Sequence, residues 1–272
     1  MPTLDVFQGD AFSAISLTRA VEHVPYVPMY LGSLGIFEPV PVMTETVAIE
    51  RRDGILTLIP TSERGSAATQ AAIEKRTLRS YTTPRLKKQD TIKAASIANL
   101  RAFGSEANLV AIQDEVMRRL GKLRRDMELT WENHRLGAVN GVVLDADGST
   151  TIVNWFTEFG ISPPTPVDFN LDSATTNVRA KCSEIVRAMA RAARGAFTPA
   201  TRVVGLCGDA FWDAVVDHDH VRSTYLNQQE ARELRAQAAF ESFDFGGITW
   251  VNYRGTDDNS AVAIGTDTAR FF

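Results

Sequence analysis

The chain of 272 residues is 44% hydrophobic, a composition that supports one large folded core or two modest ones. Twenty-nine basic residues against 33 acidic ones give a formal net charge of −4, which argues against a protein that binds nucleic acid through global basicity. No apolar run approaches the roughly 20 residues needed to cross a bilayer. The two cysteines, Cys182 and Cys207, are too few for a disulfide framework. We therefore expect neither membrane insertion nor secretion.

The first forty residues predict an arm rather than a domain. A short amphipathic stretch at residues 11–22 is followed by closely spaced prolines and glycines, which break regular elements. These breakers are Pro25, Pro28, Gly32, Gly35, Pro39 and Pro41. Such a segment is expected to lie extended across another surface.

Residues 44–86 change to a strand pattern. Strand-forming, mostly apolar residues at 46–49 and 55–59 flank the pair Asp53-Gly54, which predicts a β-hairpin with that pair in its turn. A basic, strand-like stretch follows, and residues 74–93 hold seven Lys or Arg against two acidic residues. Two interpretations stay open for it: a solvated basic face, or a contact with an acidic partner surface.

A long helix is predicted from residue 105 to residue 136. Its apolar positions keep helical spacing and form a single stripe, namely Leu109, Ile112, Val116, Leu120, Leu123, Met127 and Trp131. Ser105 is expected to open the helix, and Gly137 is expected to help end it. At 1.5 Å per residue this helix would be on the order of 45 Å long, the shape of a strut.

Two further blocks follow the helix. Residues 141–159 predict a second hairpin around residues 145–148, with residues 152–156 as its return strand. After a proline-rich connection, residues 172–264 predict helices packed on a small sheet. The expected elements are a helix capped by Ser173 or Thr175 and ended by Gly195, a buried strand at 202–207, a helix from Asp209, a helix at 228–239, a hairpin at 243–251 and a strand at 260–264.

Candidate chemistry is sparse. Two of the four histidines lie in the run Asp217, His218, Asp219, His220, which is either a site for two metal-binding imidazoles or a polar loop after a helix. Cys207 is either a nucleophile at a strand-to-helix turn or a buried structural thiol. The aromatic residues and glycines at 243–247 either stack nucleic-acid bases or fill a core beside a tight turn. The motifs GxSxG, GxxxxGK[ST], GxGxxG and HExxH do not occur in the sequence.

The order of these parts resembles the tailed-phage major capsid proteins, and more specifically the major capsid protein E family of lambda-like coat proteins. The resemblance rests on short blocks in a fixed order, from about residue 15 onward. The blocks are residues 50–54 with Leu56, Leu58, Ile59, Pro60, Arg64 and Gly65; residues 135–141; Asp147, Gly148, Phe159 and Gly160; Gly208, Phe211, Trp212, His220, Val221 and Tyr225; and Phe243, Phe245, Gly246, Gly247, Ile248, Tyr253 and Gly255.

This resemblance implies an α+β architecture, the Hong Kong 97 capsid fold. The N-terminal arm would be residues 1–41 and the extended β-hairpin loop residues 42–92. The peripheral domain would be residues 93–171, with a spine helix at about 105–136, and the α/β axial domain residues 172–272. Because family members usually continue with further strands, the chain is expected to end before the family's usual C-terminal segment.

The same resemblance implies a structural coat protein without enzymatic activity, cofactor or metal. Its copies would self-assemble into the hexamers and pentamers of an icosahedral phage head around double-stranded DNA. The expected partners are other copies of the chain, packaged DNA through weak nonspecific contact, and scaffold, portal and decoration proteins, with no membrane. Assembly is expected in the host cytoplasm, and the final location is the virion.

The basic excursion is expected to make the inter-subunit contacts. The candidate residues are Arg51, Arg52, Arg64, Lys75, Arg76, Arg79, Arg85, Lys87 and Lys88. An acidic segment around Asp209, Asp213, Asp217 and Asp219 is a candidate for the opposite side of these contacts. Two alternatives stay open: a hydrolase-like α/β enzyme using Asp209, Cys207 and His218 or His220, and another phage structural or decoration component.

Overall fold

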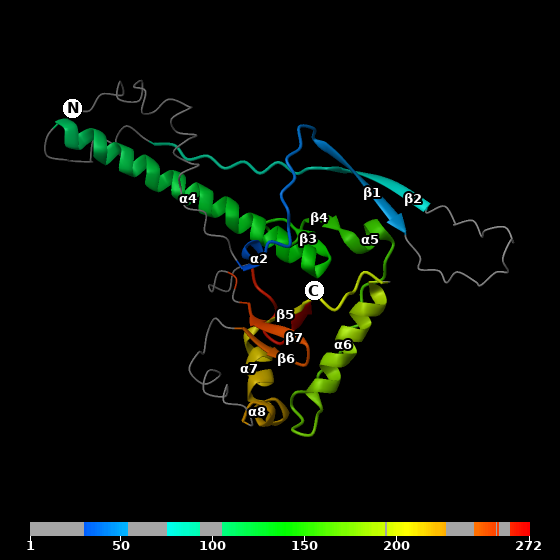
Figure 1. Ribbon diagram of the computed structural model, residues 1–272. Helices are drawn as coiled ribbons and strands as arrows, with labels where there is room; N and C mark the ends of the chain where they lie inside the picture. The colour runs from blue at the N-terminus through cyan, green and yellow to red at the C-terminus, as the bar shows by residue number, and fades with distance from the viewer. Residues whose placement is uncertain are drawn as a thin grey trace. The chain divides into compact units, whose positions relative to one another are not determined.

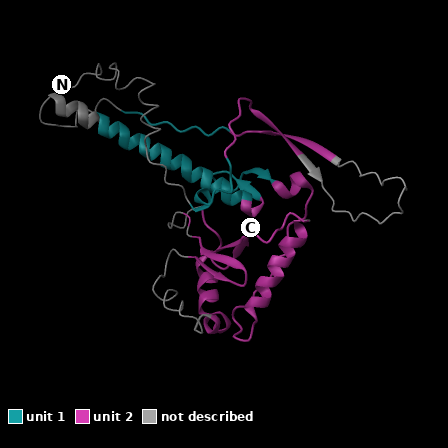
Figure 2. Cartoon of the chain, in the orientation of Figure 1, with its two compact units in different colours: residues 1–38, 85–138, 142–154 teal, residues 39–84, 139–141, 155–272 magenta. Residues whose placement is uncertain are grey.

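A computed structural model describes residues 30–53, 75–92, 105–193, 195–226, 242–253, 255 and 262–272 (Figure 1). The fold is a mixture of helices and strands, as expected. The chain has two compact units, one of residues 1–38, 85–138 and 142–154 and the other of residues 39–84, 139–141 and 155–272 (Figure 2). Among the described residues, no helix combines the length and the hydropathy of a membrane span.

The first unit is built on the long helix α4 (Ser105–Asn140). The predicted start at Ser105 is confirmed, whereas the helix continues to Asn140 instead of ending at residue 136. Gly137 lies inside the helix, where an added Cβ would come within 2.8 Å of the Cα of Val143. Glycine therefore serves there for the close passage of a neighbouring strand. The residue that follows the helix end is Gly141, in the left-handed conformation with φ of +83°.

A single helical turn, α2 (Tyr30–Ser33), interrupts the segment that the breakers predict to be extended. Leu31 of this turn is completely buried. The backbone N–H groups of Leu31 and Gly32 donate to the two carboxylate oxygens of Glu132 on α4, at 2.8 and 3.1 Å. A turn this short has little stability of its own, so the contact with α4 is what maintains it. The amphipathic stretch predicted at 11–22 lies outside the described residues.

The strands β3 (Val142–Leu144) and β4 (Thr151–Asn154) form the predicted second hairpin. In its turn, the carboxylate of Asp147 accepts hydrogen bonds from the Thr150 hydroxyl at 2.6 Å and from the backbone N–H groups of Ser149 and Thr150 at 2.9 and 2.8 Å. These bonds hold the pKa of Asp147 well below its usual range. The predicted return strand is wrong at residues 155–156, which begin the short helix α5 (Trp155–Phe159) of the second unit.

In the second unit, β1 (Thr46–Asp53) and β2 (Lys75–Thr82) form a two-stranded antiparallel ribbon. The basic strand predicted in this region is confirmed as β2. The predicted turn is wrong at Asp53, which is the last residue of β1 and lies opposite Lys75. The antiparallel ladder with β2 extends through this residue, so the strand does not turn there. The expected return strand at 55–59 lies outside the described residues.

The rest of the second unit is an α/β body with a four-stranded sheet in the order β6-β7-β5-β8. The strands are β5 (Val203–Cys207), β6 (Ser242–Phe245), β7 (Ile248–Asn252) and β8 (Ala269–Phe271), and β5 and β7 are parallel while the other two pairs are antiparallel. The helices are α6 (Val178–Ala192), α7 (Asp209–Asp217) and α8 (Asp219–Leu226). The predicted packing of helices on a small sheet is confirmed.

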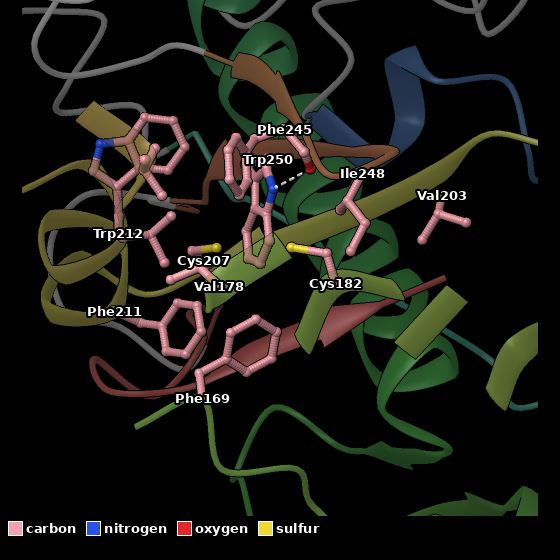
Figure 3. Packing of buried hydrophobic residues seen from close by; sticks show 12 residues of the cluster. Phe169, Val178, Cys182, Val203, Cys207, Phe211, Trp212, Phe245, Ile248 and Trp250 are labelled. Atoms are coloured by element: carbon pink, nitrogen blue, oxygen red, sulfur yellow. Dashed lines mark hydrogen bonds between the residues drawn. The ribbon is translucent and has the colours of Figure 1, made fainter. Parts of the chain in front are cut away.

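The core of this body surrounds Trp250, which is completely buried (Figure 3). Its indole N–H donates to the backbone carbonyl of Phe245 at 3.1 Å, so the polar atom of this side chain is satisfied. Phe211 of α7 stacks on it with ring centroids 6.1 Å apart, and Cys182 of α6 belongs to the same buried cluster. One face of the sheet is therefore covered by α6 and α7 together.

The start of α6 and the position of the last strand differ from the prediction. Helix α6 begins at Val178, because the side chain of Asn177 accepts the N–H of Ala180 at 3.0 Å and caps the helix in place of Ser173 or Thr175. Residues 262–264 are not a strand. The last strand is β8, whose Phe271 stacks on Phe169 at 6.0 Å and so joins the core. The helix predicted at 228–239 lies outside the described residues.

Candidate assembly surfaces

The β1–β2 ribbon exposes apolar side chains on both of its faces. Ile49 is 44% exposed and Leu78 is 68% exposed. Ile49 lies opposite Arg79 and Leu78 lies opposite Glu50, and residues that face each other across an antiparallel pair point to the same side. Since Ile49 and Glu50 are neighbours in one strand, the two apolar side chains lie on opposite faces.

One end of the ribbon is held on α5 within the second unit. The ring of Tyr81 meets Trp155 edge-on at 5.8 Å, and Trp155 stacks on Phe159 at 5.7 Å. Beside them, Arg79 forms an ion pair with Glu158 at 3.2 Å. This anchor was not predicted from the sequence, although the spacing of Trp155 and Phe159 by four residues is typical of an aromatic pair on one helix face.

The basic residues predicted to make inter-subunit contacts have different surroundings. Arg64 lies outside the described residues, and only the backbone is described for Arg51, Arg52 and Lys75. Three others have ion-pair partners within the chain: Arg76 with Glu50 at 3.5 Å, Arg79 with Glu158, and Lys88 with Asp126 at 2.5 Å. Arg85 and Lys87 are exposed and form no ion pair with any other residue that the structure describes.

Two glutamates on α4 are buried, with Glu128 4% and Glu132 1% exposed. Arg124 pairs with Glu128 at 3.0 Å, and Arg135 lies 3.5 Å from Glu132, which also holds α2. By contrast Trp131, the last member of the predicted apolar stripe, is 45% exposed. The role of Glu132 was not predicted from the sequence, because its partner Leu31 lies 101 residues away and leaves no local pattern.

The acidic residues proposed as the opposite side of the contacts lie on exposed positions of α7 and α8. Asp209, Asp213 and Asp217 follow one another at intervals of four residues along the outer face of α7, and Asp219 begins α8. The buried residues Phe211, Trp212 and Val215 occupy the opposite, core-facing side of α7. The helix thus presents a continuous acidic face.

The two imidazoles of the candidate metal run do not converge. His218 is buried, its Nε2 lies 3.1 Å from the carbonyl of Ser173, and its Nδ1 accepts the backbone N–H of His220 at 3.1 Å. Because Nδ1 accepts, the proton resides on Nε2, and both ring nitrogens are used in the fold. The ring of His220 instead meets Phe245 edge-on. In the part of the chain that is described, no three His, Cys, Asp or Glu side chains form a metal-binding group.

The remaining candidates for chemistry are core residues. Burial raises the pKa of Cys207 to about 12 and that of Cys182 to about 11, so both thiols are protonated at neutral pH. This protonated, buried state supports the interpretation of Cys207 as a structural thiol. Phe245 is buried and Phe243 packs on Trp212 at 5.1 Å, while Gly246 and Gly247 make the turn with positive φ. These residues therefore fill the core.

Comparisons with known proteins agree over most of the chain. A sequence model of the family described as phage major capsid protein E matches residues 13–272. The chain is also 24% identical over 260 residues to the major capsid protein of Salmonella phage Felix O1, a similarity that covers 90% of this chain and 70% of that protein. The matched region includes the ribbon, α4 and the α/β body.

Proposed function

Because this chain belongs to the phage major capsid protein E family, it is a structural coat protein of a bacteriophage, and we propose that its copies form the hexamers and pentamers of an icosahedral head around double-stranded DNA. The proposed architecture is the Hong Kong 97 capsid fold. The arm is residues 1–41, the extended loop residues 42–92, the peripheral domain residues 93–171 and the axial domain residues 172–272.

The observation that carries this proposal is the exposure of the β1–β2 ribbon. A two-stranded ribbon is at best marginally stable in water when it is isolated. Fully burying an exposed Leu or Ile contributes about 1.5–3 kcal/mol, so covering the remaining exposed area of Leu78 or Ile49 with a neighbouring copy would contribute about 1–2 kcal/mol each. Many such contacts, repeated around a closed shell, give a stable assembly from individually weak interactions.

Negative-stain electron microscopy with light scattering, at several protein concentrations, tests assembly. Capsomer rings or closed shells are expected, with a steep dependence on concentration because association follows mass action. A chain that stays monomeric at every concentration would contradict the proposed assembly.

The basic excursion supplies contacts to the neighbouring copy through Arg51, Arg52, Arg64, Lys75, Arg76, Arg79, Arg85, Lys87 and Lys88. Arg85 and Lys87 are the best members to test, because they are exposed and form no ion pair among the described residues. The double variant Arg85→Glu/Lys87→Glu should impair shell formation and leave the circular dichroism of the monomer unchanged. Lys122→Glu, at an exposed position of α4, is the control. Normal shell formation by the double variant would show that these two residues do not contribute to the contact.

Contact with packaged DNA is weak and independent of sequence. A chain with a net charge of −4 releases few counterions on binding, so the driving force is small. Filter binding should detect only salt-sensitive, nonspecific retention, and a tight sequence-specific site would contradict this. Assembly takes place in the host cytoplasm with scaffold, portal and decoration proteins as further partners.

A further inference from the structure

Helix α6 has a basic outer face that was not predicted from the sequence. Its inner side buries Val178 and Cys182 completely, while Arg187 and Arg191 are exposed on the opposite side and Arg179 is exposed at the edge between the two sides. The helix contains four basic residues and one acidic residue, and that acid, Glu184, lies 4.0 Å from Lys181 of the same helix. Within the described part of the chain, none of the three exposed arginines forms an ion pair.

Helices α7 and α8 have the opposite charge. Together they contain four aspartates and a single basic residue, Arg222. Asp213, Asp217 and Asp219 are exposed and form no ion pair with another described residue. The excess of positive charge on α6 is therefore matched by an equal excess of negative charge on α7 and α8.

Both faces lie on helices that cover one face of the same sheet. In Figure 3, Trp250 lies between Cys182 of α6 and Trp212 of α7, and in Figure 1 α6 stands apart from the α7–α8 pair. The side chains that pack on the core leave the charged faces directed away from it. The two faces are thus not placed to neutralise each other within the chain.

We propose that the basic face of α6, defined by Arg179, Arg187 and Arg191, docks on the acidic face of α7 and α8 in the next copy of this chain. A contact between identical faces would place like charges together, which disfavours a two-fold dimer through either helix. A head-to-tail contact joins unlike charges, and when repeated by rotation it closes a ring. This inference rests on the proposed function and names the surfaces that meet within a capsomer.

This pairing replaces the basic excursion as the partner of the acidic face. Arg76, Arg79 and Lys88 of the excursion already have ion-pair partners in the chain. Among its described side chains this leaves Arg85 and Lys87 without one, whereas α6 carries three such arginines on a single helix. The exposed alanines Ala180 and Ala188 lie beside these arginines on the same helix. Their small side chains permit close approach of a neighbouring helix.

Charge reversal with reciprocal rescue tests the pairing. The variants Arg187→Glu/Arg191→Glu and Asp213→Arg/Asp217→Arg each give the body two faces of like charge. Each should raise the protein concentration needed for half-maximal ring formation at least tenfold in light scattering at low salt. The combined four-residue variant, with the charges exchanged, should return this concentration to within about threefold of the original, since complementarity is restored.

A matched control and a mixing experiment complete the design. Arg202→Glu/Arg270→Glu reverses two exposed basic residues of the same body outside α6 and should leave assembly unchanged. An equimolar mixture of the two reversed variants should form rings in which the variants alternate, which keeps the test decisive if the combined variant does not fold. Normal assembly of either reversed variant, or folded variants that neither combination nor mixing rescues, would overturn the pairing. Failure of the unmodified chain to assemble would instead contradict the proposed function.

Discussion

At the residue scale, the two glycines within α4 have different surroundings. Around Gly121 no atom lies within 4 Å of an added Cβ, whereas at Gly137 such a Cβ would come within 2.8 Å of the backbone of Val143. Alanine is favoured over glycine in a helix interior by about 1 kcal/mol. We therefore expect Gly121→Ala to raise the free energy of unfolding by up to about 1 kcal/mol.

The same substitution at Gly137 should have the opposite effect. The backbone of β3 cannot move aside as a flexible side chain would, so overpacking should lower the free energy of unfolding by about 1–3 kcal/mol. Urea unfolding of both variants, followed by circular dichroism, measures the difference in sign. Equal stability of Gly137→Ala and Gly121→Ala would show that the close approach of β3 has no energetic consequence.

Glu132 is the second residue whose role follows from its contacts. Glu132→Gln preserves the size of the side chain but replaces one acceptor oxygen with a donor, so one of the two N–H groups of α2 loses its acceptor. A buried donor without an acceptor costs about 1–3 kcal/mol. Hydrogen exchange at Leu31 and Gly32 should therefore become faster.

The control is Glu115→Gln on the same helix. The hydrogen bonds of Glu115 are with the side chains of Arg118 and Arg119, which hold its pKa at about 2, and not with α2. Exchange at Leu31 and Gly32 should be unaffected by that variant. Identical exchange at Leu31 and Gly32 in the two variants would show that Glu132 does not stabilise α2.

At the element scale, the ribbon is held by aromatic packing more than by charge. Trp155→Ala removes the ring partner of Tyr81, and such pairs contribute about 0.5–1.5 kcal/mol beyond the area that they bury. Arg79→Ala removes an ion pair whose two side chains are 40% and 42% exposed, a type of contact that contributes at most about 1 kcal/mol. We expect faster hydrogen exchange across β1 and β2 in Trp155→Ala than in Arg79→Ala. The reverse order would mean that the ion pair is the main anchor.

At the scale of the whole molecule, assembly should change the protection of segments that one copy leaves exposed. Val40 is 74% exposed, Val42 47% and Met43 fully exposed, and they directly precede the ribbon. Hydrogen exchange compared between monomer and shell should show new protection at residues 39–50 and 76–84. The buried strands β5 and β7 should be protected in both states, which makes them the internal reference. Unchanged exchange in residues 39–50 and 76–84 would mean that other surfaces hold the shell.

Local patterns in the sequence were enough to predict several helices and strands of this protein and its resemblance to a family. The apolar spacing along α4, the buried strand before Asp209, the two-glycine turn at 246–247 and the ordered family blocks are all visible without coordinates. Each depends on residues that are close in the chain, where helical or strand periodicity records the environment directly. For the same reason α4, β5, α7 and the β6–β7 hairpin were predicted near their observed positions.

Features that depend on contacts between residues far apart in the sequence were revealed only by the tertiary structure. A glycine is needed at position 137 of α4 because β3 passes beside it. The buried Glu132 accepts the backbone N–H groups of Leu31 and Gly32. β1 continues through Asp53 because its partner strand begins at Lys75. The basic face of α6 and the acidic face of α7 become oriented only when both helices pack on one sheet. Contacts of this kind leave no local periodicity, so only the folded chain reveals them.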